Sequence, residues 1–205
     1  MRLQRTLKQK VSFEGIGLHT GRYSKVHLKP APRDTGIIFI RTDKELAIKA
    51  SIGSVTDTAF STTLGYNGIK IRTVEHILAA LYGLGIDNLI AEVNGPEIPI
   101  LDGSSTELIS LIIKGGIAKQ SKKRPYIRIT SPVVLTDGHA EIAAFPHNGI
   151  HITYRIHFNH YLLGEQNLSL ELTEESFAME IAPARTFGFL KDVEYLKANG
   201  FARGG

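Results

Sequence analysis

The chain has 205 residues, of which 42% are hydrophobic and 21% charged, and its formal net charge at pH 7 is +4. This length and apolar fraction allow one large or two small globular domains with a substantial core. Cysteine and tryptophan are absent, which excludes disulfides, cysteine nucleophiles and thiolate metal sites, so any bound metal must be held by His, Asp or Glu.

The first clear pattern is a glycine-rich turn, Glu14–Gly21, between two strand-like runs. Its three glycines within a few positions indicate tight backbone geometry. They match neither G-x-G-x-x-G nor a P-loop, so the turn does not predict phosphate binding. His19 can face a site, but a turn histidine is more often held by backbone groups.

A hairpin is expected ahead of the central helix. Ile69 and Ile71 alternate with polar residues as in a half-buried strand. Asn67-Gly68 is the pair that permits a tight turn back to Ser61–Leu64. The sequence therefore predicts two antiparallel strands, the second of which ends near Ile71.

The hydrophobic period then changes to that of a helix, with apolar residues at Val74, Ile77, Leu78, Leu81 and Leu84. Thr73 is placed to accept hydrogen bonds from the first free N–H groups, and Gly83 and Gly85 are available to end the helix. Glu75 and His76 are therefore expected in its first turn.

This adjacent pair, Glu75 and His76, is the first candidate for chemistry. The positive end of the helix dipole favours an ionised Glu75 and a neutral imidazole at His76, which can then donate a lone pair to a metal. The structural interpretation is the commoner one for the pair alone, because Glu is frequent in first turns and His76 can be an ordinary half-buried side chain. No His-Glu-x-x-His motif is present.

After this helix the pattern predicts a strand at Leu89–Val93, a turn, and a short extended run at Glu97–Leu101. Ser104–Glu107 has the spacing of a capping box and is followed by apolar residues at helical spacing. The second helix is expected to stop at Gly115-Gly116.

The polar, charged segment Lys119–Pro125 is interpreted as a linker rather than a binding patch. Several strands follow, with turns at Asp137-Gly138 and Asn148-Gly149. His157 and His160 could share a metal, but two histidines at a strand end are usually solvated. A final helix is expected at about Lys191–Ala198.

The N-terminal stretch and the distribution of charge limit where the protein is located and which partners it binds. The N-terminal stretch Met1–Lys8 is charged, and no stretch is long and apolar enough to cross a bilayer. With the lack of cysteine, this indicates a cytoplasmic protein. No concentrated basic face or nucleic-acid-binding signature is visible, and an anionic small substrate fits the mild positive charge at least as well.

Five stretches, taken together and in order, carry a family resemblance: Gly15–Gly21, Thr73–His76, Gly85–Asn88, Pro96–Ser104 and Ala184–Phe189. Over its whole length the chain resembles the zinc-dependent UDP-3-O-acyl-N-acetylglucosamine deacetylases of lipid A biosynthesis in Gram-negative bacteria. The resemblance implies a cytoplasmic, monomeric metal-dependent amidohydrolase. Its implied substrate is a UDP-linked acylated glucosamine, and its implied cofactor is Zn²⁺.

The fold that the resemblance implies is α+β, with two similar domains, each a small, mostly antiparallel sheet packed on a pair of helices. The first domain is expected over residues 1–118, with a linker at 119–125. The second, over residues 126–205, is expected to be incomplete. It includes an insert at about 184–201 that forms a tunnel for the acyl chain.

The resemblance also implies roles for residues. His76 is implied as a zinc ligand, Glu75 as the general base and Thr186 as a group that stabilises the oxyanion. Phe158 and Asn159 are implied to lie near the uridine part of the substrate. Residues implied to line the acyl tunnel are Phe187, Phe189, Val193, Leu196 and Phe201.

One departure from the family pattern is severe. The family completes its zinc site with a His and an Asp from a His-Lys-x-x-Asp-type segment and supplies a further catalytic His, and none of these occurs in the sequence. A catalytic zinc normally keeps three protein ligands. The chain is therefore expected to be a C-terminally truncated deacetylase that is inactive alone. The alternative is a non-catalytic remnant that binds sugar nucleotide or acyl chain.

Overall fold

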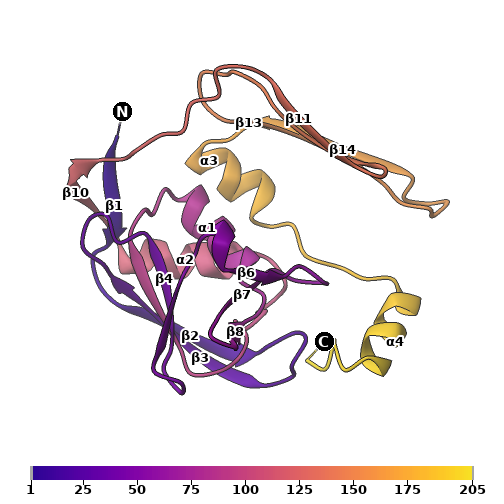
Figure 1. The fold of residues 1–205 in the computed structure, drawn as a ribbon, viewed down its shortest axis with the longest axis horizontal. Coiled ribbons are helices and arrows are strands. Elements are labelled where there is room, and N and C mark those ends of the chain that lie inside the picture. Colours follow the sequence, from indigo (N-terminus) through magenta and orange to yellow (C-terminus); the bar gives the residue numbers. More distant parts are fainter. Residues whose placement is uncertain (1, 205) are drawn as a thin grey trace. The chain divides into compact units, whose positions relative to one another are not determined.

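The computed structural model describes residues 2–204 and separates into two compact units. The first unit contains Met1–Arg124 and Ala178–Gly205, and the second contains Pro125–Phe177. Figure 1 shows the elements of both units. The protein is α+β, with short helices and several small, mostly antiparallel sheets, as the sequence predicts.

The largest sheet of the first unit has five strands in the order β2-β3-β9-β4-β5. Their bounds are Val11–Ile16 (β2), Tyr23–Pro30 (β3), Leu89–Val93 (β9), Ile37–Arg41 (β4) and Leu46–Lys49 (β5). Only β4 and β9 pair in parallel; the other pairs are antiparallel. Alternate residues such as Val26 and Leu28 are fully buried, because a strand sends every second side chain to the same face.

Two helices complete the core of this unit, α1 at Glu75–Gly83 and α2 at Thr106–Gly115. They contact one another, and α2 also contacts β2. Their buried apolar residues are Ile77, Ala80 and Leu81 in α1 and Leu108, Ile109 and Ile112 in α2. Each helix ends beside a glycine with positive φ, Gly85 at 67° and Gly116 at 71°, which confirms the predicted stops.

A three-stranded sheet of β6 (Val55–Asp57), β7 (Thr63–Tyr66) and β8 (Ile69–Ile71) leads into α1. A short 3-10 turn, η1 (Ile52–Ser54), precedes β6. Between β7 and β8, Asn67 and Gly68 have φ values of 47° and 78°, as a two-residue hairpin turn of type I′ requires. The predicted hairpin is therefore confirmed.

The predicted helix caps are wrong at both N-termini. The residue before α1 is Val74, and Thr73 has a φ of 59° and caps nothing. The residue before α2 is Ser105, which makes no side-chain capping bond, so no capping box forms. The Thr73 and Ser105 hydroxyls instead donate to Glu97 and to the His76 carbonyl oxygen, and the Ser104 hydroxyl bonds to its neighbours Asp102 and Thr106.

Strand β1 (Leu3–Leu7) pairs with β10 (Ile117–Lys123) in a separate antiparallel sheet. β10 covers most of the segment expected as a linker, and the two units divide after Arg124 instead. The difference arises because Lys119 and its neighbours form hydrogen-bonded pairs with a strand at the opposite end of the unit's sequence.

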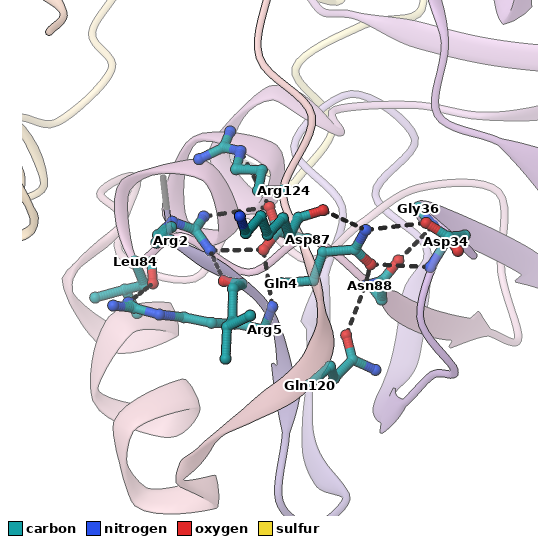
Figure 2. A network of polar contacts seen from close by, with 12 residues as sticks. Arg2, Gln4, Arg5, Asp34, Gly36, Leu84, Asp87, Asn88, Gln120 and Arg124 are labelled. Carbon is teal, nitrogen blue, oxygen red and sulfur yellow. Dashed lines mark hydrogen bonds and ion pairs between the residues drawn. The ribbon is translucent and has the colours of Figure 1, made fainter.

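Asp87 joins these strands to the loop after α1 (Figure 2). Its carboxylate accepts a hydrogen bond from the Arg5 N–H at 2.8 Å and forms ion pairs with Arg2 at 2.7 Å and Arg124 at 3.1 Å. The next residue, Asn88, bonds through its side chain to other parts of the network. The Gly85–Asn88 signature therefore has a structural role in closing the first unit.

The second unit consists of two separate hairpins and a short helix. The strands are β11 (Val133–Asp137), β12 (Ala140–Ala144), β13 (His151–His157) and β14 (Glu165–Glu171). The helical segment α3 (Glu174–Ser176), capped by Thr173, leads into a π-helical turn, η2 (Phe177–Ile181). Residues 178–205, with helix α4 (Leu190–Ala198), group with the first unit rather than with this one. Within residues 2–204, no helix is both long and apolar enough to cross a membrane.

Candidate active site at the start of helix α1

Glu75 and His76 occupy the first turn of α1, as predicted, and both side chains are half-buried. The Glu75 Oε2 atom accepts a hydrogen bond from the Thr62 N–H at 2.8 Å. The Ser105 hydroxyl donates to the His76 carbonyl oxygen at 3.2 Å, which ties the start of α2 to the start of α1. The pair is therefore held by the loop before β7 on one side and by the second helix on the other.

A second carboxylate, Glu97, lies beneath the glycine-rich turn and is fully buried. Its Oε1 atom accepts hydrogen bonds from the His19 N–H at 2.9 Å and the Thr73 hydroxyl at 2.7 Å. Its Oε2 atom accepts from the Thr20 N–H and the Thr20 hydroxyl, both at 2.7 Å. A buried carboxylate is tolerated only when its oxygens are bonded in this way.

The surroundings of Glu97 shift its pKa in two opposing directions. Burial disfavours the charged form and raises the pKa. The donors on Thr20, His19 and Thr73 outweigh burial together, so the pKa of Glu97 lies below its ordinary value of 4.5. Glu97 is therefore an ionised, internally bonded carboxylate at neutral pH.

This lowered pKa predicts a pH dependence of folding. A carboxyl group with a depressed folded-state pKa contributes stability that is complete above the ordinary value, 4.5, and is lost as the pH falls through the folded-state pKa. We expect acid to lower the urea midpoint of unfolding less steeply below pH 4.5 in Glu97→Gln than in the unchanged chain. Because other carboxylates also titrate there, the difference between the two slopes is the measured quantity. Parallel slopes would show that Glu97 does not contribute.

The glycine-rich turn is built closely around this carboxylate. A Cβ atom added at Gly17 would lie 2.5 Å from Glu97 Oε2 and 2.9 Å from Glu97 Cβ. The His19 ring is buried, and its Nε2 atom donates to the Phe60 carbonyl oxygen at 3.2 Å. The expectation that backbone groups hold this turn histidine is therefore met at one ring nitrogen. The other, Nδ1, has no hydrogen-bond partner among residues 2–204.

Thr186 lies beside the turn that precedes α2. Its N–H donates to the Gly103 carbonyl oxygen at 3.0 Å, and the Ser105 N–H donates to Ala182 at 2.9 Å. Since Ser105 also bonds to His76, this turn links the Thr186 segment to the start of α1. Three residues implied by the resemblance, Glu75, His76 and Thr186, are thus connected through one short turn.

The other residues expected to bind substrate lie in three places. The Phe187 and Phe189 rings meet edge to face at 5.8 Å, and Val193 and Leu196 are half-buried residues of α4. Phe201 instead packs against neighbouring rings, with centroid distances of 5.6 Å to His19 and 5.4 Å to Phe60, and the Arg72 guanidinium lies 5.6 Å from its centroid. Phe158 and Asn159 belong to the second unit, at the turn after β13.

The donors of the site match a metal ion in part. His76 supplies one imidazole, and Glu75 beside it supplies a carboxylate. Within residues 2–204, no group of three or more His, Asp or Glu side chains is arranged to hold a metal ion. These residues therefore do not form a complete three-ligand site by themselves.

Sequence patterns single out Glu75 and His76 but miss the role of Glu97. The available signal was a lone carboxylate inside an otherwise apolar extended run, Pro96–Leu101. A buried charge needs several donors, and these come from segments 24 and 77 or 78 positions away. No local sequence pattern indicates that these distant segments lie around Glu97.

Fold and site together define an α+β protein with a glutamate–histidine pair at a helix start, supported by a second, buried glutamate. Residues 4–205 match the family model described as UDP-3-O-acyl N-acetylglycosamine deacetylase (LpxC). The chain belongs to this family.

Curated relatives agree with this assignment. The chain is 51% identical over all of its length to a UDP-3-O-acyl-N-acetylglucosamine deacetylase of Thermodesulfovibrio yellowstonii, of which it covers 70%. It is 45% identical to proteins of the same name from Syntrophus aciditrophicus and Syntrophotalea carbinolica. It covers 66% of each of these, so the chain spans about two thirds of the length of these relatives.

Proposed function

We propose that this chain carries part of the active site of a zinc-dependent enzyme that removes the N-acetyl group from UDP-3-O-acyl-N-acetylglucosamine in the cytoplasm, in lipid A biosynthesis. The observation that supports the proposal most is the Glu75–His76 pair in the first turn of α1, linked through one turn to Thr186. The names of the relatives supply the substrate.

In the proposed mechanism His76 would be one of the residues that hold the zinc ion. A zinc ion bound there would lower the pKa of its bound water to about 7. Glu75 takes a proton from the attacking water, and the Thr62 N–H keeps its carboxylate oriented. The Thr186 side chain donates a hydrogen bond to the negative charge that develops on the acetyl oxygen.

The remaining assignments are part of the same proposal. Phe158 and Asn159 contact the uridine of the substrate, and Phe187, Phe189, Val193 and Leu196 contact its acyl chain. Phe201 contacts the acyl chain as well, and its ring contacts with His19 and Phe60 give it a packing role besides. The working enzyme is proposed to be a monomer.

Two proteins test this function. One is the 205-residue chain, and the other is the same chain extended by the part of the T. yellowstonii relative that it does not match. We expect the extended chain to bind one zinc and to release acetate from the UDP-sugar. The 205-residue chain is expected to bind zinc weakly and to release none, because its described residues hold no three-ligand cluster. Substrate binding without turnover in the extended chain would favour the non-catalytic alternative.

Val193 tests the proposed acyl contact. We expect Val193→Trp in the extended chain to lower kcat/KM for a long-chain substrate at least about tenfold more than for a short-chain one, since a filled apolar pocket rejects the larger group. Glu194→Gln, the next position of α4 and exposed, is the control and is expected to affect both substrates equally. Equal losses for both substrates in Val193→Trp would assign Val193 to packing.

A further inference from the structure

Glu97 is bonded to the segment that leads into α1 by its side chain and by its neighbours' backbone. The Arg72 N–H donates to the Pro96 carbonyl oxygen at 2.9 Å, and the Ile98 N–H donates to the Arg72 carbonyl oxygen at 3.1 Å. These bonds place residue 97 directly opposite Arg72 in a parallel bridge. The Thr73 hydroxyl, one residue further on, then reaches the Glu97 carboxylate at 2.7 Å.

Thr73 has a backbone conformation that needs such an anchor. Its φ of 59° lies in the left-handed region, which a β-branched residue adopts rarely and at a cost. Strain of this kind persists only where the surroundings hold the residue in place. Thr73 itself is buried, and its hydroxyl bond to Glu97 is the polar contact that holds its side chain.

The conformation of Thr73 decides how the chain enters the helix. The next residue, Val74, donates its N–H to the Thr62 carbonyl oxygen at 3.3 Å. The Thr62 N–H in turn donates to the Glu75 carboxylate. The position of the Glu75 side chain therefore depends on the turn that the chain makes at Thr73.

We propose that Glu97 is a positioning residue. Through the Thr73 hydroxyl it fixes the direction in which the chain passes from β8 into α1, and thereby the positions of Glu75 and His76. The proposal rests on the proposed catalytic roles of these two residues. Glu97 touches neither substrate nor reacting atoms; it acts by holding Thr73 in its left-handed conformation.

A purely structural role for Glu97 does not explain all four of its hydrogen bonds. A buried ion in an apolar setting is a poor way to gain stability, because desolvation offsets its bonds. A carboxylate that served only to close the glycine-rich turn would need the His19 and Thr20 donors alone. The fourth donor, Thr73, belongs to the strained residue two positions before Glu75.

The test compares amide hydrogen exchange in the 205-residue chain and in Glu97→Gln, with Thr73→Val as a second variant that keeps the β-branched shape and removes the hydroxyl. We expect exchange at the Thr62 amide, which bonds to Glu75, to rise about tenfold in both variants, while amides of strand β9 change little. The double variant is expected to show no further rise, since both changes act on the same bond: Thr73→Val removes its donor, and Glu97→Gln makes its acceptor neutral and the bond weaker.

Asp87→Asn is the matched control. Asp87 is another enclosed carboxylate of this unit that accepts a backbone N–H and side-chain donors, but it lies beyond the opposite end of α1. It is expected to lower stability without altering Thr62 exchange. An unchanged Thr62 amide in Glu97→Gln, or an equal rise at Thr62 and β9, would overturn the proposal. A rise in Glu97→Gln but not in Thr73→Val would overturn it as well.

In the extended chain, Glu97→Gln is expected to lower kcat about tenfold and to leave KM little changed, because positioning of the base affects the chemical step. A normal rate in this variant, with a low rate in Glu75→Gln, would reject the positioning role but not the proposed function. A normal rate in both variants, with altered Thr62 exchange, would reject the proposed function and leave the structural coupling intact.

Discussion

Replacing Glu75 with glutamine in the extended chain is expected to lower the rate of acetate release by about 10²- to 10⁴-fold, the usual contribution of a positioned general base. A glutamine amide cannot take the proton of the attacking water. Its carbonyl oxygen can still accept the Thr62 N–H bond, and the side chain is only half-buried. The fold and the bound zinc are therefore expected to remain, and the loss is expected in kcat.

The control for this change is Glu107→Gln. Glu107 is the acidic residue in the first turn of α2, as Glu75 is in the first turn of α1, but its side chain is exposed. Steady-state rates, zinc per chain and melting temperature are measured for both variants. If Glu75→Gln released acetate as fast as Glu107→Gln, Glu75 would have no part in the mechanism.

The second large effect is expected at Gly17, where the glycine-rich turn approaches Glu97. An added methyl group would lie within 3.0 Å of three Glu97 atoms, and that side chain cannot move away without breaking its four hydrogen bonds. Overpacking costs about 1–3 kcal/mol, and each buried group left unbonded adds about 1–3 kcal/mol. We expect Gly17→Ala to lower the free energy of unfolding by about 3 kcal/mol or more.

Gly53→Ala is the matched control, because a Cβ atom at Gly53 in η1 would meet nothing within 4 Å. It is expected to change stability by less than about 0.5 kcal/mol, as surface substitutions usually do. Urea unfolding followed by circular dichroism measures both variants. Equal stability of the two would show that the turn can relax around Glu97.

Local chemistry was enough to predict much of the first unit from its sequence. The hairpin at Asn67-Gly68, the first-turn position of Glu75 and the glycine stops at Gly85 and Gly116 are confirmed. Each of these features depends on residues within a few positions of one another, through the helical period or a preference for positive φ. Sequence motifs typical of the family also predicted the family to which the chain belongs, and the match to the family model confirms it.

Features that depend on distant segments were missed or misjudged. The sequence predicted Thr73 as a helix cap, but its hydroxyl bonds to Glu97, and the predicted capping box at Ser104–Glu107 is likewise absent. A hydroxyl bonds to whichever acceptor the fold brings near, and sequence spacing alone does not identify that acceptor.

The sequence by itself determined the family, the α+β class and the first-turn place of Glu75 and His76. Only the tertiary structure placed Lys119–Lys123 in a strand beside β1, grouped residues 178–205 with the first unit, and surrounded Glu97 with its four donors. Strand pairing and the burial of a charge are decided between segments far apart in the chain. Their partners become definite only when the whole unit has folded.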